Sequence, residues 1–179
     1  MGSGLITTPR LRLVPHDPEY LRALIDGPEN YARISGMSPA KGLREFIVSP
    51  DVSVEWMAAL QTAAGADPWK YGFAVVENAS GLVIGSAGFT GPPDDAGNVE
   101  IAYGIVPDYE GRGFATEAAT ALVAFARKDQ RVRTVCAHTL PARNASTRVL
   151  EKCGFQFAGE VNHPTDGLIW RWEQERTCP

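Results

Sequence analysis

The sequence predicts one α/β domain, built on a mixed and mostly antiparallel central sheet with helices on its sides. The chain has 179 residues, of which 44% are hydrophobic and 21% charged, enough for one core without disulfide or metal support. Segments that alternate apolar and polar residues are interleaved with segments of helical spacing. This interleaving predicts a layered protein, and neither a repeat nor a two-domain chain. We expect the domain to span residues 8–176, with residues 1–7 a cloning remnant or a disordered N-terminus.

The first part of the chain predicts a strand followed by helices. Residues 10–15 (RLRLVP) alternate polar and apolar side chains, which is typical of a strand with one buried face. Residues 16–28 place apolar side chains at helical spacing and end in Gly-Pro, which predicts a helix and its stop. Residues 29–67 are irregular apart from a predicted helix within residues 52–64 (VSVEWMAALQTAA).

From residue 71 onward the pattern changes to strands and longer helices. Residues 71–77 and 82–90 flank the turn-forming NASG at 78–81, which predicts a β-hairpin. The remaining predicted elements are a strand at 98–106, a helix at 114–128, a strand at 133–140, a helix at 145–153, and strands at 155–161 and 167–173.

Composition narrows the possible partners and the compartment. A formal net charge of -4 and a pI near 5.4 argue against a broad basic surface for nucleic acid. We expect no membrane span, because no stretch approaches about 18 consecutive apolar residues, and the N-terminus lacks a signal-peptide pattern. Cys136, Cys153 and Cys178 lack C-x-x-C spacing, which favours a reducing compartment. A cytoplasmic protein is therefore predicted, with two buried cysteines and one thiol in the tail.

The histidines predict no metal site. His16, His138 and His163 lack the spacing of metal ligands, and no Ser/His/Asp arrangement can be assembled from their positions in the sequence. We expect each of them to be structural or exposed.

A glycine-rich turn at 105–122 (IVPDYEGRGFATEAATAL) predicts an anion site. The first N–H groups of a helix lack intrahelical partners, and the helix dipole adds partial positive charge there. A P-loop is excluded because no Lys-Ser or Lys-Thr pair occurs. A dinucleotide fingerprint fails because Thr116 stands where its third glycine belongs. A tight turn that only begins a helix remains the alternative.

The residues around this turn resemble a known family. Residues 107–118 (PDYEGRGFATEA) resemble the acyl-CoA loop of the GNAT superfamily of N-acyltransferases, whose pattern is [QR]-x-x-G-x-[GA]. Gly113 and Ala115 occupy the last two defined positions, whereas Glu110 stands where glutamine or arginine is usual. Residues 138–160 resemble the ribosomal-protein N-terminal acetyltransferase (Rim-like) branch, which has the form P-x-N-x-x-S-x-x-V-L-E-K-x-G-F. Two further segments resemble the same branch: residues 8–15 (TPRLRLVP) and residues 166–173 (DGLIWRWE).

The resemblance implies a GNAT fold whose sheet is splayed between the fourth and fifth strands, and acetyl-CoA as cosubstrate without a metal. The implied reaction moves the acetyl group to a primary amine by direct attack in a ternary complex. By this resemblance, Ile105 and Val106 offer free backbone groups to the pantetheine arm and the acetyl carbonyl, with Gly104 allowing a bulge. The implied pyrophosphate ligands are the N–H groups of Gly111, Arg112, Gly113, Ala115 and Thr116.

Two catalytic residues are implied by position. Glu100 resembles the strand glutamate that serves as general base, directly or through water, in several branches. An amine-binding carboxylate and a surface or structural ion pair are alternatives. Ser146 matches the serine that is thought to protonate the leaving thiolate, and a cap of the following helix is an equal alternative. Leu150 stands where many relatives have the tyrosine used for that protonation.

The same segment departs from the family pattern at one further place. Arg143 replaces the usual asparagine and could reach a phosphate, while Asn144 beside it could take over the pantetheine contact. Together with Glu110 and Leu150, this departure leaves an alternative function: a sensor or partner module that binds acyl-CoA without turnover. Acetylation of antibiotics or polyamines is another alternative. The sequence indicates neither the acceptor nor whether the protein is a monomer or a homodimer, and Trp170 and Trp172 could line the acceptor groove or an interface.

Overall fold

The computed structural model describes residues 4–48 and 54–176. Its strands are β1 (Ile6–Thr7), β2 (Leu11–Pro15), β3 (Ser38–Pro39), β4 (Phe73–Glu77), β5 (Leu82–Phe89), β6 (Asn98–Ile105), β7 (Thr134–Thr139), β8 (Gln156–His163) and β9 (Gly167–Glu175). Its helices are α1 (Pro18–Asp26), α2 (Pro28–Ser35), α3 (Leu43–Ile47), α4 (Val54–Thr62), α5 (Pro68–Tyr71), α6 (Phe114–Ala126) and α7 (Ala145–Lys152). The strands and helices predicted from residue 71 onward are all present, with ends shifted by at most a few residues.

The sheet is mixed and mostly antiparallel, as predicted. Its strand order is β1-β2-β4-β5-β6-β7-β9-β8. The pair β6–β7 is parallel, the other neighbours along this path are antiparallel, and β3 forms a short parallel pair with β5. The parallel pair is the product of a crossover through α6, which links the C-terminal end of β6 to the start of β7.

The predicted hairpin forms between β4 and β5. The Gly81 N–H donates to the Glu77 carbonyl at 2.8 Å, and Gly81 has φ +72°, which favours glycine. β4 is buried over residues 73–76, so it reads as a continuous apolar run because helices cover both of its faces.

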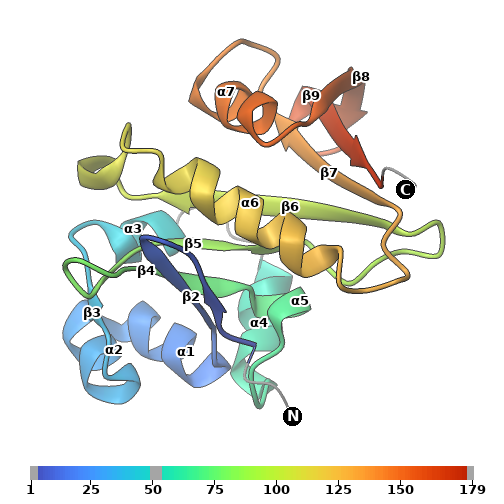
Figure 1. Ribbon diagram of the computed structural model, residues 1–179. Coiled ribbons are helices and arrows are strands. Elements are labelled where there is room, and N and C mark those ends of the chain that lie inside the picture. The colour runs from blue at the N-terminus through green and yellow to red at the C-terminus, as the bar shows by residue number, and fades with distance from the viewer. Residues whose placement is uncertain (1–3, 49–53, 177–179) are drawn as a thin grey trace.

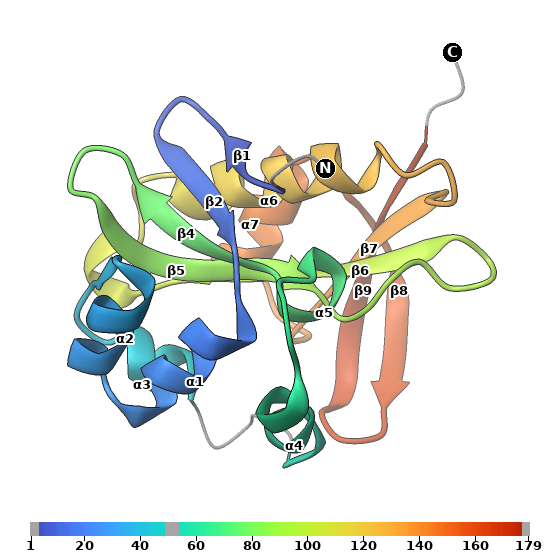
Figure 2. The same cartoon turned by 90° about the horizontal axis from the view of Figure 1, so that it is seen from below.

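The layers of the fold place helices on both sides of the sheet (Figure 2). In that view α6 lies on one side of β4–β6, and α1–α3 lie on the other. α6 presents buried alanines together with Phe114 and Leu122 to the sheet. These residues belong to one continuous core that also includes Phe73, Val99 and Ile101.

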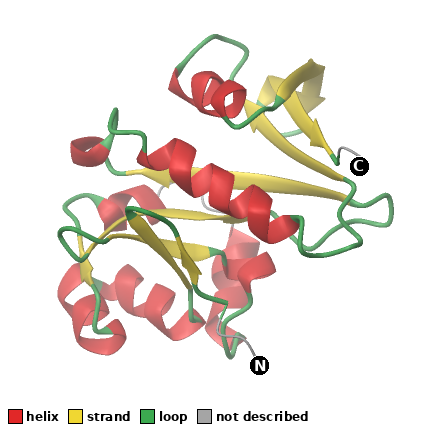
Figure 3. Ribbon diagram, viewed as in Figure 1, coloured by secondary structure: helices red, strands yellow, loops and turns green. Residues whose placement is uncertain are grey.

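The sheet opens between β6 and β7, which are the fourth and fifth of the strands predicted from the sequence. Their pairing is confined to residues 98–100 and 134–136, and the two strands then diverge toward their C-terminal ends (Figure 1). The loop between β6 and α6 lies at the open end of this gap (Figure 3), so the sheet divides into β1–β6 and β7–β9 beside a helix N-terminus.

The segment at 29–67 contains more helix than its pattern predicts. α2 ends at Gly36, which has φ +71°, and α3 begins after Gly42, which has φ +85°. α3 has 5 residues, and α5, which directly follows this segment, has 4. Helices this short are missed because they display little more than one turn of periodicity.

Among residues 4–48 and 54–176, no helix has the length and apolar composition to cross a membrane. The same ranges contain no group of three His, Cys, Asp or Glu side chains that could hold a metal ion. Cys136 and Cys153 are free thiols, buried and half-buried respectively, and burial raises the pKa of Cys136 to about 11. Cys178 lies outside the described residues.

Candidate active site

The turn before α6 presents unpaired backbone donors. Gly111 and Gly113 have φ values of +71° and +82°, a conformation that side chains other than glycine rarely adopt. The first helical bond runs from the Glu117 N–H to the Gly113 carbonyl. In the described part of the chain, the N–H groups of residues 111–116 have no partner. The turn therefore has the free donors and positive helix end that an anion requires.

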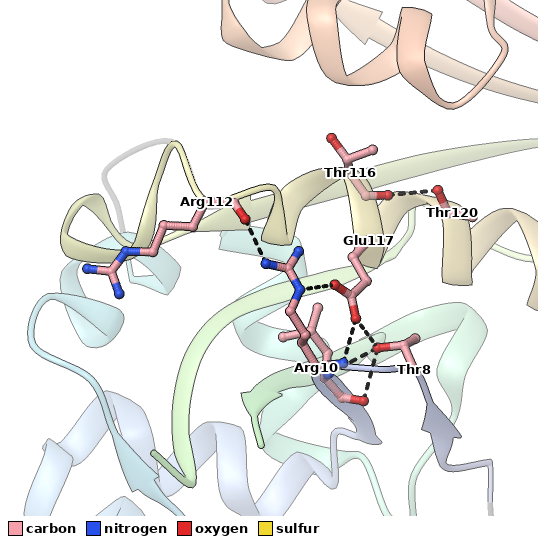
Figure 4. A network of polar contacts seen from close by, with 7 residues as sticks. Thr8, Arg10, Arg112, Thr116, Glu117 and Thr120 are labelled. Atoms are coloured by element: carbon pink, nitrogen blue, oxygen red, sulfur yellow. Dashed lines mark hydrogen bonds and ion pairs between the residues drawn. The ribbon is translucent and has the colours of Figure 1, made fainter. Parts of the chain in front are cut away.

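A polar network anchors this turn to the N-terminal strands (Figure 4). The Glu117 carboxylate accepts hydrogen bonds from the Thr8 hydroxyl at 2.6 Å, the Arg10 N–H at 2.8 Å and the Arg10 Nε at 2.7 Å. Arg10 Nη1 donates to the Arg112 carbonyl at 2.8 Å, and its guanidinium carbon lies 4.6 Å from the Phe114 ring centroid. Arg10, in the turn between β1 and β2, thus links these strands to α6 and to the glycine turn.

The Arg112 side chain is engaged away from the helix N-terminus. Arg112 Nη2 donates to the Asp108 carbonyl at 2.8 Å, and its guanidinium stacks at 5.0 Å on the Tyr109 ring. Glu110 is exposed. The peptide groups of the turn are therefore better placed to contact an anion than the Arg112 guanidinium.

Backbone groups at the end of β6 differ from the expectation in one respect. The Val106 N–H donates to the Ile84 carbonyl at 2.8 Å, and the Val106 carbonyl accepts from the Tyr109 N–H at 2.9 Å. Val106 is therefore not a free donor. Neighbouring residues of a strand point their peptide groups to opposite edges. The N–H and carbonyl groups of Ile105 therefore point toward the gap, where β6–β7 pairing has already ended.

The expected bulge at Gly104 is also absent, because pairing of β6 with β5 continues through Gly104 without a register shift. The small residue serves another purpose: a Cβ at this position would overlap the Phe46 ring. Gly104 thus allows Phe46 of α3 to lie directly on β6.

A cavity of about 170 Å³ lies in the gap between β6 and β7. Its lining includes Glu100, Tyr103, His138, Ser146 and Leu150. Glu100 and His138 form an ion pair in which Oε1 lies 2.7 Å from Nδ1. Their side chains are 30% and 20% exposed, so a small molecule can reach a carboxylate and an imidazole already joined.

A second cavity, of about 430 Å³, adjoins the Glu100 side of the sheet. It is lined by Phe46, Ile47, Trp56, Ser86, Ala102, Tyr103 and Gly104. Ala102 and Gly104 share a strand face with Glu100, because side chains alternate along β6. We call this space the apolar cavity.

The start of α7 borders the cavity in the gap. Asn144 is the N-cap, and its side chain accepts from the Thr147 N–H at 3.1 Å while Thr147 Oγ1 accepts from the Asn144 N–H at 3.0 Å. The interpretation of Ser146 as the cap was wrong, because the helix begins at Ala145. Ser146 is exposed in the first turn. Arg143 pairs with Glu151 at 2.9 Å.

Tyr103 connects β6 with α7. Its hydroxyl donates to the Ser146 carbonyl at 3.5 Å, and burial raises its pKa above the ordinary tyrosine value. A phenol lies at the gap although Leu150, at the position of the usual tyrosine, is buried in the core. The raised pKa makes this phenol a weaker proton donor than a free tyrosine.

The tryptophans of β9 do not share the face of His138. Trp170 and Trp172 pair with Thr139 and Ala137, which alternate with His138 along β7. Trp172 is 4% exposed and donates to Thr139 Oγ1 at 3.0 Å. It is a core residue, and neither tryptophan borders the Glu100–His138 pair.

The sequence analysis did not anticipate the contact between His138 and Glu100. In the parallel register of β6 and β7, Glu100 is opposite Cys136, and His138 is the next side chain on that face. The alternation of side chains along each strand indicates which residues share a face with Glu100 or with His138. The register that brings the two strands together is a tertiary property.

Taken together, the fold and the site define an α/β protein in which a glycine turn with unpaired backbone donors stands beside a gap in the sheet. A family model described as an acetyltransferase (GNAT) domain matches residues 10–156. The chain therefore belongs to the GNAT acetyltransferase family. This confirms the predicted superfamily and fold.

Individual relatives agree with this assignment. An uncharacterized N-acetyltransferase, YjdG of Bacillus subtilis, is 30% identical over 91 residues, which span 51% of this chain and 52% of that protein. The ribosomal-protein-S5-alanine acetyltransferase of Vibrio fischeri has a TM-score of 0.64 at 13% identity, with 97% of both chains covered. The microcin C7 self-immunity acetyltransferase MccE, solved with acetyl-CoA and AMP, has a TM-score of 0.63 at 14% identity, with 98% of both chains covered.

Proposed function

We propose that this protein is an N-acetyltransferase that moves an acetyl group from acetyl-CoA to a primary amine in a ternary complex. The observation that carries the proposal is the position of the Glu100–His138 pair in a cavity of the opened sheet. Donors for a phosphate stand at one end of the gap, and a proton acceptor lines its interior. An amine in the apolar cavity would approach the gap from the face of Glu100.

The residues of the turn fit a CoA pyrophosphate. Donors at residues 111–116 are unpaired, and Gly111 and Gly113 remove side chains from the approach. Ile105 presents its backbone to the gap and would hold the pantetheine arm, with Asn144 and Ser146 on the opposite wall. Ser146 would protonate the departing thiolate.

The apolar cavity favours an acceptor with one amino group on an apolar body. The lining is mostly aromatic and aliphatic, and the Ser86 hydroxyl is occupied by contacts with His16 and the Phe73 carbonyl. A polyamine or an aminoglycoside carries several cations, each of which needs a partner when desolvated. Among the described residues that line the two cavities, Glu100 is the one carboxylate. One carboxylate suits one ammonium group, so peptide N-termini and small monoamines are the preferred acceptors.

The test measures amine-dependent release of the CoA thiol over a panel of acceptors. The panel contains peptides with apolar and with acidic N-terminal residues, aliphatic and aromatic monoamines, spermidine and an aminoglycoside. We expect the apolar monoamines and peptides to give the highest kcat/KM. Acetyl-CoA binding without thiol release from any acceptor would contradict acetyl transfer and favour the sensor, whereas a preference for spermidine or the aminoglycoside would contradict the acceptor class.

A further inference from the structure

The Glu100–His138 pair has a defined orientation. His138 Nδ1 faces Glu100 Oε1 at 2.7 Å, and no described residue forms a hydrogen bond with the other ring nitrogen, Nε2. A carboxylate accepts hydrogen bonds only, so the tautomer that satisfies this contact carries its proton on Nδ1. The lone pair is then on Nε2, in a ring that lines the cavity between β6 and β7.

We propose that His138 accepts the proton of the acceptor amine at Nε2, and that Glu100 acts as its positioning residue; this inference rests on the proposed acetyl transfer. An imidazole has an ordinary pKa of about 6.5, compared with about 4.3 for a glutamate. A base works best when its pKa lies near the working pH. The Glu100 carboxylate fixes the ring orientation and stabilises the imidazolium after proton transfer.

The other ionisable groups around the ring leave this role to His138. On β7, burial raises the pKa of the Cys136 thiol to about 11, so it is neutral at working pH. On β9, Arg171 is the register partner of His138, but its Nε is bound to Glu173 at 2.6 Å. Asp94, before β6, is held by Asn98. On β6, Tyr103 is neutral because burial raises its pKa, and α7 contributes the uncharged Ser146 to this lining.

The proton transfers balance as follows. His138 Nε2 takes one proton from the ammonium group, and the free amine attacks the thioester carbon. A C–N bond forms and the C–S bond breaks, with the electron pair leaving on sulfur. The second amine proton neutralises the thiolate through Ser146 or water, and the imidazolium returns its proton to solvent. The products are the N-acetyl amide, the CoA thiol and one released proton.

The test replaces the ring and restores it chemically. His138→Ala should lower kcat by about 10²–10⁴-fold and leave the affinity for acetyl-CoA unchanged. Added imidazole should raise the kcat of this variant at least about tenfold. The activity of Glu100→Ala should not rise with added imidazole, because the His138 ring is still present in this variant. His163→Ala removes an exposed histidine far along the β8–β9 hairpin and is the matched control; it should keep full activity and show no response to imidazole.

A spectroscopic measurement separates positioning from general structure. ¹⁵N NMR of the histidine rings should show His138 as the Nδ1–H tautomer in the unaltered protein and as a tautomer mixture in Glu100→Gln. Activity that survives His138→Ala, or a folded His138→Ala variant that imidazole does not rescue, would overturn the assignment. Failure of the unaltered protein to release CoA with any amine would instead overturn the proposed function.

Discussion

Glu117 offers a quantitative test of how the N-terminal strands support the glycine turn. Its carboxylate is 14% exposed and accepts hydrogen bonds from the Thr8 hydroxyl, the Arg10 N–H and the Arg10 side chain. Glu117→Ala removes these acceptors and leaves two donors of the β1–β2 turn unpaired. Each such bond contributes about 1 kcal/mol net, and the ion pair is discounted because Arg10 is 48% exposed.

The expected loss for Glu117→Ala is therefore about 2–3 kcal/mol in the free energy of unfolding. For a chain of this size that corresponds to a fall in Tm of about 4–12 °C, measured by chemical and thermal unfolding. Glu117→Gln keeps one oxygen acceptor and should lose less. Because Arg10 also donates to the Arg112 carbonyl, the affinity of the alanine variant for acetyl-CoA should fall about fivefold, or about 1 kcal/mol.

The pH dependence gives the sign of the Glu117 contribution. Burial alone would raise the pKa of Glu117, but the hydrogen bonds from Thr8 and Arg10 outweigh it and the pKa is lowered. The stabilisation is therefore complete above the unfolded carboxyl pKa of about 4.3, and it is lost as the pH falls through the lower folded value. A stability difference between the unaltered protein and Glu117→Ala that is under 1 kcal/mol at pH 7, or unchanged at pH 3, would refute this reasoning.

Three further predictions test the turn, the core and α7. Gly113→Val places a β-branched residue at φ +82° and should lower the affinity for acetyl-CoA at least about tenfold. Calorimetry measures this affinity, with Gly113→Ala as the milder control. Unchanged affinity would contradict an anion site at the turn. Burial lowers the pKa of His16 to about 4, so about 3 kcal/mol of stability should be lost between pH 6.5 and 4, and unfolding of His16→Gln should lack this slope. Asn144→Ala should cost about 1 kcal/mol and Asn144→Ser should recover most of it; equal stabilities would argue against the cap.

Much of the fold can be predicted from residue 71 onward because the signals there are local. The hairpin around residues 78–81 has a turn between two apolar runs, and the strand at 98–106 leads directly into glycines and a helix. Residues 29–67 lack such signals, since their helices are short and separated by glycines in the left-handed conformation. Their positions follow from packing against the sheet, as in the contact of Phe46 with Gly104.

The candidate site divides in the same way. The glycine turn could be found because all of its donors belong to adjacent residues, and its chemistry is that of the main chain. The Glu100–His138 pair joins residues 38 positions apart, and the engagement of Val106 depends on the register of β5. Neither contact leaves a local pattern, so neither could be derived from periodicity or spacing.

The sequence by itself determined the turn at 111–113 and the order of the elements from residue 71 onward, because periodicity, glycine conformation and helix termini act over a few neighbouring residues. Its resemblance to known motifs indicated the family. Only the tertiary structure decided that His138 faces Glu100, that Phe46 lies over Gly104 and that Arg10 holds the turn through Glu117. These contacts depend on strand register and helix packing, which are set by the burial of the whole core.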